Sequence, residues 1–196
     1  MGFLAKLLRR GDSARTDALR LYSTAMTQAR QPEFYGEGRV ADNYDGRIDV
    51  LTLHLALIIR ALNTHGEQGK RLAQAIYEVM RDDWDVALRE EGMSDTGVMK
   101  RIKPMIRLFY TRLKAYSDGI EAGSIEEALH HGVLAPPIPE PDAETNDEPK
   151  TLADMPYSAF VALLSAYTME MAKNLAGKSL GELALGQFEM ATPPNV

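Results

Sequence analysis

The chain has 196 residues, of which 45% are hydrophobic and 26% are charged, and it contains no cysteine. This composition predicts a soluble globular protein with one main core and excludes a chain that is disordered throughout. The absence of cysteine excludes disulfides and thiolate metal sites, and a net charge of −6 argues against a general nucleic-acid coat, which would be basic.

The charge is unevenly distributed along the chain. Residues 1–135 carry 19 basic and 19 acidic side chains, whereas residues 136–196 carry 3 and 9. Within the neutral part, residues 78–95 hold seven acids against two arginines, and residues 98–115 hold six bases and no acid. This separation predicts a polarised surface that can steer a charged partner, and the alternative is a pair of ordinary solvated helix faces.

The first elements are a basic segment and a helix. Residues 1–12 form a short basic amphipathic stretch without the long apolar region of a signal peptide, and we expect a frayed terminus or a weak membrane-surface contact. Asp12 or Ser13 can cap a helix that ends near Arg30, just before Pro32.

Two helices with clear apolar stripes are predicted next. The first starts at Asp45 or Gly46, carries the apolar run 50–59 and ends within residues 63–66. The second covers residues 72–88, and Gly92 is suited to end it.

Two more helices are predicted before residue 132. Ser94 or Asp95 can cap the first, in which Pro104 predicts a kink or a fresh start near Lys103. The second is a short helix up to His131, for which Ser124 and the glutamate three residues later fit a capping box.

Composition changes abruptly after Gly132. Residues 133–150 are rich in proline and acid and predict a flexible or extended linker, after which residues 151–196 resume a helical pattern that can dock on the preceding helices. The predicted fold is therefore all-α, with a basic segment (1–12), one helical domain (13–132), a Pro/acid-rich linker (133–150) and a docked C-terminal helix (151–196).

No arrangement of residues typical of catalysis is recognised. The four histidines lie in no metal-binding spacing, no nucleophile elbow or phosphate loop occurs, and adjacent aspartates spread around a helix instead of forming a cation cage. We therefore expect no metal, no cofactor and no enzymatic activity. An enzyme would require a cleft in which His54 or His65 converges with carboxylates.

A row of cations points more clearly to a function than any candidate catalytic residue does. Lys100, Lys103, Arg107 and Lys114 are separated by 3, 4 and 7 residues, so a continuous helix places them on one face, with Tyr110 beside them. Such a row can bind phosphates, an acidic peptide or an anionic membrane, or it can pair internally with the acids of the preceding helix.

The centre of the chain carries an ordered block of motif residues between positions 79 and 116: Asp82, Asp85, Leu88 to Gly92, Asp95, Gly97, Val98, Lys100, Lys103, Phe109, Tyr110, Arg112, Ala115 and Tyr116. This block resembles the ubiquinol–cytochrome c chaperone family, and the resemblance covers roughly residues 15–130. The pattern around Tyr167 and Phe188 looks similar to bacterial members, but more weakly.

The resemblance implies an α-helical, non-enzymatic assembly factor for the cytochrome bc1 complex (complex III of the respiratory chain) that binds newly made cytochrome b. Mitochondrial relatives act with a small partner near the ribosomal tunnel exit. We therefore expect a cytoplasmic protein that can lie peripherally at the inner membrane, with cytochrome b as partner, the ribosome or an anionic membrane as further contacts, and no sequence-specific nucleic acid.

The expected recognition surface combines the basic helix with its acidic neighbour. Its residues are Lys100, Lys103, Arg107, Tyr110, Arg112, Lys114, Asp82 and Asp85. The alternative function is a helical protein that binds a small ligand or a lipid at the membrane surface. A deep apolar pocket would favour that alternative, and a solid core would count against it.

Overall fold

The computed structural model describes residues 3–134 and 158–194, and within them the chain is helical without a β-strand, as the all-α prediction requires. Most of the predicted linker lies outside these residues. In chain order the elements are α1 (Phe3–Ala29), the 3-10 turn η1 (Pro32–Phe34), α2 (Tyr44–Asn63), α3 (Gly66–Glu90), α4 (Asp95–Ala122), α5 (Glu126–His130), α6 (Ser158–Ala176) and α7 (Leu180–Ala184).

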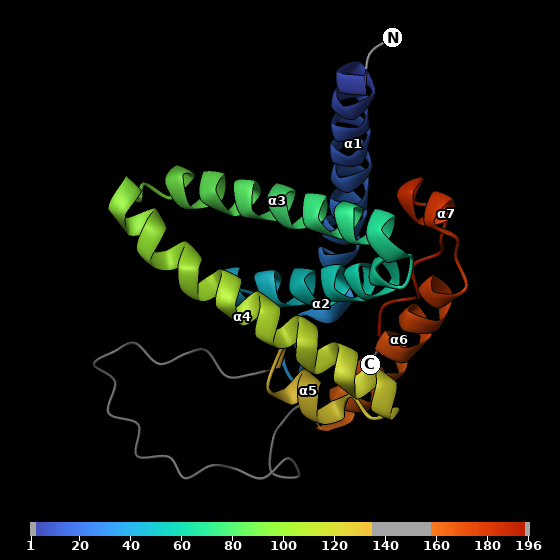
Figure 1. Cartoon of the computed structure of the whole chain (residues 1–196). Coiled ribbons are helices and arrows are strands. Elements are labelled where there is room, and N and C mark those ends of the chain that lie inside the picture. Colours follow the sequence, from blue (N-terminus) through green and yellow to red (C-terminus); the bar gives the residue numbers. More distant parts are fainter. Residues whose placement is uncertain (1–2, 135–157, 195–196) are drawn as a thin grey trace.

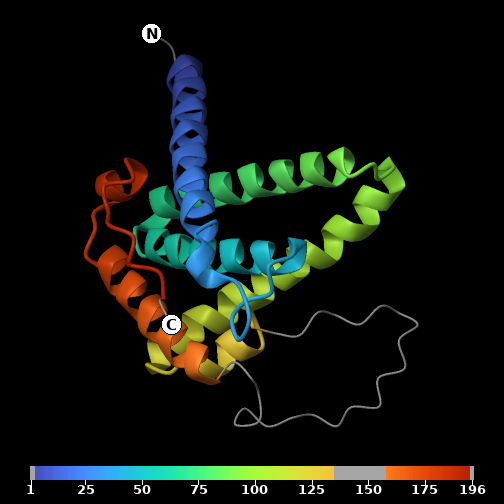
Figure 2. The same ribbon diagram turned by 180° about the vertical axis from the view of Figure 1, so that it is seen from behind.

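Helix α2 lies at the centre of the molecule (Figures 1 and 2). Every residue from Leu51 to Ile59 is buried, because α1, α3, α4 and α6 all pack against this helix. A helix surrounded on all sides must be apolar all round, which explains the unbroken hydrophobic run seen in the sequence. The N-terminal part of α1 projects from this body, and α3 and α4 meet at a corner that projects to one side.

The first helix begins earlier than predicted. It runs without a break from Phe3, so Asp12 and Ser13 lie inside it and do not cap it. The basic amphipathic segment and the first predicted helix are therefore one continuous element.

The corner between α3 and α4 forms as the sequence predicts. Gly92 adopts a left-handed conformation (φ +85°), and the Ser94 side chain accepts a hydrogen bond from the amide of Gly97 (3.3 Å). Helix α4 then continues through Pro104 to Ala122, so the predicted fresh start near Lys103 is wrong.

The predicted capping box at Ser124 is also wrong. The Ser124 amide donates to the carbonyl of Gly119 (3.0 Å) and thus still belongs to the end of α4, so α5 begins at Glu126 with Ile125 as its N-cap. A capping box forms instead at the start of α7, between Ser179 and Glu182.

A buried polar network fixes the C-terminal part of the chain to the centre. The Tyr167 hydroxyl on α6 lies 2.6 Å from Nε2 of His54 on α2, and His54 Nδ1 lies 2.7 Å from the carbonyl oxygen of Val50. Because a carbonyl only accepts, the ring proton is on Nδ1, so Nε2 accepts from Tyr167. Gln28 of α1 donates to the same hydroxyl (3.1 Å) and to the carbonyl of Ala191 (3.0 Å), which joins α1, α2, α6 and the C-terminal segment.

No helix in residues 3–134 or 158–194 combines the length and the apolar character that crossing a membrane requires.

Candidate functional site

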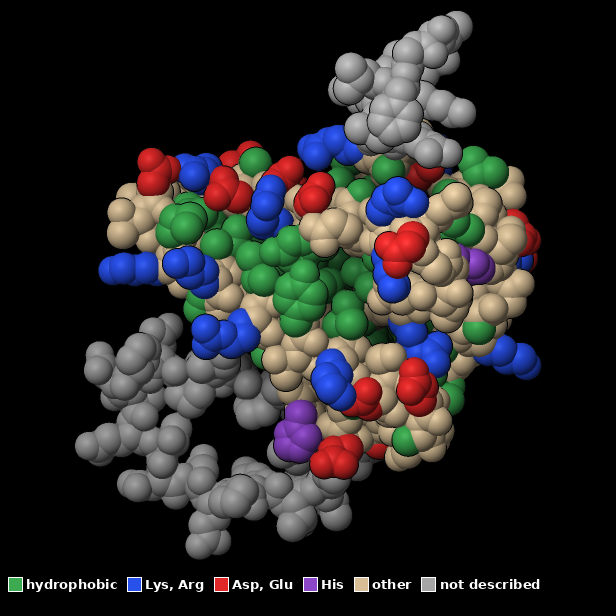
Figure 3. All heavy atoms as spheres, viewed as in Figure 1, with side chains coloured by type: hydrophobic (Ala, Val, Ile, Leu, Met, Phe, Trp, Pro, Cys, Tyr) green, Lys and Arg blue, Asp and Glu red, His purple; other side chains and the backbone are tan. Residues whose placement is uncertain are grey.

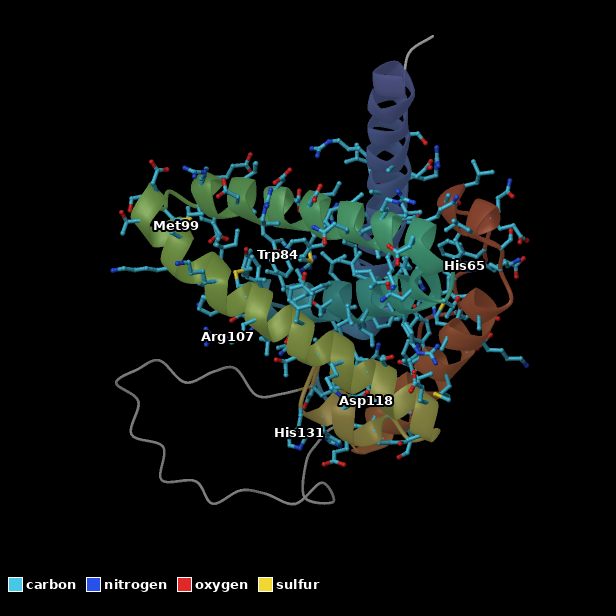
Figure 4. All side chains as sticks on the ribbon, in the orientation of Figure 1. His65, Trp84, Met99, Arg107, Asp118 and His131 are labelled. Atoms are coloured by element: carbon cyan, nitrogen blue, oxygen red, sulfur yellow. The ribbon has the colours of Figure 1, made fainter. Side chains whose placement is uncertain are left out.

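Helices α3 and α4 diverge from their shared corner (Figure 1), and apolar side chains gather in a strip between them (Figure 3). Trp84 lies between the two helices (Figure 4) and is 3% exposed, with its ring 6.3 Å from that of Phe109 in an edge-to-face contact. Towards the surface, the rings of Tyr77 and Tyr110 lie 5.5 Å apart. These contacts hold the two helices together while keeping the outer side of the strip open.

The outer side of the strip is only partly covered. Met99 is 54% exposed and Tyr110 is 49% exposed, and the other members are half-buried. We call this set the apolar strip: Tyr77, Met99, Ile106, Tyr110 and Leu113. Figure 3 shows apolar side chains gathered between α3 and α4 on this face. Contiguous exposed apolar surface of this kind is typical of protein or membrane interaction sites.

A row of cations borders the strip on α4. Lys100, Lys103 and Arg107, which we call the cationic row, are exposed, and their side chains make no hydrogen bond or ion pair with any residue of the described part of the chain. Arg107 lies on the edge of α4 away from Trp84 (Figure 4). Lys114, in contrast, pairs with Asp118 one turn further along the helix.

The two acids of α3 that the sequence assigned to the recognition surface, Asp82 and Asp85, are paired with other residues. Asp82 lies 2.8 Å from Arg81 and 3.5 Å from Arg15 of α1, and the hydrogen bond from Arg81 holds the pKa of this carboxyl below its usual value. Asp85 pairs with Arg89 at 2.6 Å. The described residues therefore show no pairing between these acids and the cationic row, which was the alternative explanation for the row.

The structure corrects the prediction that Arg112 belongs to the partner-binding surface. It is 7% exposed and forms an ion pair with Asp49 of α2, so its charge is used inside the molecule. Burial lowers its pKa, yet a guanidinium stays protonated, and the pair joins α2 to α4. We therefore remove Arg112 from the partner-binding surface.

His54 and His65 do not line a shared cleft with carboxylates in the described part of the chain. His54 is buried in the network described above, and burial lowers its pKa to about 4, so the ring is neutral. Neither His54 nor His65 contacts a carboxylate among residues 13–134 and 159–194. The same residues contain no cluster of three or more acidic or histidine side chains able to hold a metal ion.

The apolar strip is the part of the site that sequence reasoning missed. Met99, Ile106, Tyr110 and Leu113 follow one another at intervals of 7, 4 and 3 residues, which is the pattern of a buried helix face. This pattern favours burial of Ile106 and Leu113 in the core. They are only half-buried because α3 diverges from α4. No local sequence pattern predicts that divergence.

Three comparisons connect this architecture with known proteins. The family model described as ubiquinol-cytochrome C chaperone matches residues 37–190. The crystal structure of the Cbp3 homolog from Brucella abortus superposes with a TM-score of 0.72 at 29% identity, and 97% of each chain is covered.

Two curated relatives are more distant. The ubiquinol-cytochrome c reductase complex assembly factor 1 proteins of Mus musculus and Homo sapiens are each 23% identical over 120 residues, or 61% of this chain. The matched part spans only 41% and 40% of those relatives. The family match covers most of the chain and agrees with the helical fold, so the chain belongs to the ubiquinol-cytochrome C chaperone family.

Proposed function

We propose that this chain is a non-enzymatic assembly chaperone of the cytochrome bc1 complex that binds newly made cytochrome b on the α3–α4 face. The observation that carries the proposal is the juxtaposition of the apolar strip with the cationic row. A membrane subunit that has not yet been assembled exposes apolar segments, and the strip offers them contact with aromatic and thioether side chains.

The cationic row contributes a second kind of recognition. The three positive charges of the row have no partner among the described residues, and they attract acidic loops of a client or anionic lipid headgroups near it. A row of this kind increases the rate of encounter and fixes orientation, whereas the apolar strip supplies most of the contact area. The two features together favour a binding protein at the membrane surface.

The alternative function, a lipid or small-ligand carrier, is less well supported. An apolar opening bounded by α1, α2 and α3 measures about 230 Å³. This is below the roughly 300–1,000 Å³ of ordinary small-molecule pockets and is too small for a lipid chain. A larger opening of about 510 Å³ lies beside α6 and the segment after α7, but its lining is mainly polar (Asn174, Lys178, Gln187 and Glu189), which does not suit a lipid chain.

Site-specific crosslinking tests the proposed client surface. A photoreactive amino acid at Met99 or Tyr110 is expected to crosslink to cytochrome b during its synthesis, because both side chains are about half exposed within the strip. The same amino acid at Leu185, which is 55% exposed after α7, is the matched control and is expected to give no such product. Equal crosslinking from Leu185, or none from Met99 and Tyr110, would contradict the proposal.

A further inference from the structure

The opening bounded by α1, α2 and α3 lies on the side of the molecule seen in Figure 2, where the end of α1, the start of α2 and the C-terminal half of α3 come together. Its volume is about 230 Å³. The walls are mainly apolar and are formed by Met26, Ala29, Ile48, Leu51, Trp84 and Ala87. An opening of this size accommodates one large apolar side chain.

Polar groups with unused hydrogen-bonding capacity surround the opening. The Arg30 side chain forms no hydrogen bond or ion pair with a described residue. The Tyr44 hydroxyl is buried and also lacks a hydrogen-bond partner among the residues described. A buried hydroxyl is normally satisfied, so this one points to an acceptor that an occupant would supply.

The remaining polar residues of the opening are already engaged. Asp83 accepts a hydrogen bond from the Tyr22 hydroxyl (2.7 Å), and Arg47 lies 2.7 Å from Asp42 and over the ring of Tyr35 (5.3 Å). These contacts fix the groups around the opening before any ligand arrives. They leave Arg30 and Tyr44 as the groups free to bind an acceptor.

We propose that this opening binds a polypeptide segment that inserts one apolar side chain between α1, α2 and α3 and presents an adjacent carboxylate to Arg30 and Tyr44. A carboxylate accepts from a guanidinium and from a hydroxyl at the same time, which satisfies both free groups. Asp83 helps to raise the pKa of Tyr44 and so lies near its hydroxyl, and the positive charges of Arg30 and Arg47, which line the same opening, offset the negative charge of Asp83. The carboxylate comes from the end of a chain or from an acidic side chain, and both sources share this chemistry.

Trp84 is the only tryptophan in the sequence and lines the opening, so its fluorescence reports occupancy directly. Three N-acetylated peptides serve as probes of the full chain: Gly-Ser-Gly-Ser-Leu with a free carboxylate, the same peptide as an amide, and Gly-Ser-Asp-Leu-Gly as an amide. At least one of the two peptides with a carboxylate beside leucine is expected to give a saturable change in emission. The free-acid and aspartate peptides distinguish the two sources of the carboxylate.

Two variants and one control make the test specific. Arg30→Glu is expected to weaken peptide binding at least tenfold, whereas Arg71→Glu, an exposed change elsewhere on α3, is expected to leave it unchanged. Ala87→Leu fills the apolar opening without altering charge and is expected to abolish binding while the melting temperature is maintained.

Several results would overturn the proposal. They are equal binding of the neutral amide peptide, unchanged binding to Arg30→Glu, the absence of a saturable change with both carboxylate peptides, and a Trp84 response to anionic phosphatidylglycerol vesicles in place of the peptides. The site is independent of the proposed client surface, because crosslinking from Met99 and Tyr110 does not depend on Arg30.

Discussion

Most of the buried polar network depends on a single group, the hydroxyl of Tyr167. It donates to His54 and accepts from Gln28, and each of those side chains makes a further hydrogen bond to a backbone carbonyl. Phe34 packs edge-on against both rings at 5.3 Å. The network therefore couples the position of α6 to that of α1 and α2.

Replacing Tyr167 by phenylalanine keeps the ring and removes the hydroxyl. His54 Nε2 is then buried without a donor, and we expect the free energy of unfolding to fall by about 1–3 kcal/mol. Urea denaturation measures this change. Tyr110→Phe, whose exposed hydroxyl has no partner in the described residues, is the control and is expected to change stability little; equal effects of both changes would contradict the network's role.

His54 also predicts a pH dependence of stability. Its pKa is about 4 in the folded protein against an ordinary value of 6.5, so between these values the unfolded chain binds the proton more strongly. The contribution of His54 to the free energy of unfolding is therefore complete above pH 6.5. It decreases as the pH falls towards 4, by roughly 3 kcal/mol in total.

Comparison with His54→Gln isolates this effect from the titration of carboxylates. The decrease in the free energy of unfolding between pH 6.5 and 4 is expected to be shallower in the variant than in the parent chain. Parallel pH profiles of the two proteins would show that His54 is not the group responsible.

Arg112 illustrates the limit of prediction for single residues. It follows Arg107 by five positions, which places it about 140° away around a helix, so the spacing already separates it from the cationic row. The sequence does not reveal that this other direction is occupied by Asp49, which lies 63 residues earlier. Ion pairs between distant segments become visible only when the packing of the helices is known.

At the scale of elements, the starts and ends of helices were predicted best where one local motif decides them. Gly92 and Ser94 set the α3–α4 corner because their conformations and hydrogen bonds involve only neighbouring residues. Ser124 misled the prediction because its amide is taken by the end of the preceding helix. The continuity of α1 across residue 12 likewise has no local signal at that position.

Pro104 lies in the interior of α4 and cannot donate a hydrogen bond to the carbonyl of Lys100, which also meets the proline ring. Proline in a helix interior costs about 3 kcal/mol relative to alanine. Pro104→Ala is therefore expected to raise the free energy of unfolding by about 1–3 kcal/mol, as thermal or urea denaturation measures. A loss of stability would show instead that the proline is required for the packing of α4.

At the scale of the whole molecule, the central fact is that α3 and α4 meet at one end and diverge at the other. The helical class and the cationic row follow from composition and spacing. The apolar strip does not, because the same residues would be buried if the two helices remained parallel. The family match then gives this surface its proposed role in assembly of the bc1 complex.

The role of the cationic row is most directly tested in cells that depend on the bc1 complex. The variant Lys100→Glu/Lys103→Glu/Arg107→Glu reverses three exposed charges that have no partner in the described structure, so we expect normal folding and accumulation of the protein. Lys173→Glu, an exposed reversal on α6, is the matched control.

The decisive measurement is the amount of assembled bc1 complex, read from its cytochrome b haem spectrum and from native gels, after the gene is deleted and then replaced by each variant. We predict that deletion lowers assembled complex and cytochrome b, that the Lys173→Glu gene restores both, and that the triple reversal does not. Normal levels of assembled complex in the deletion strain would contradict the account.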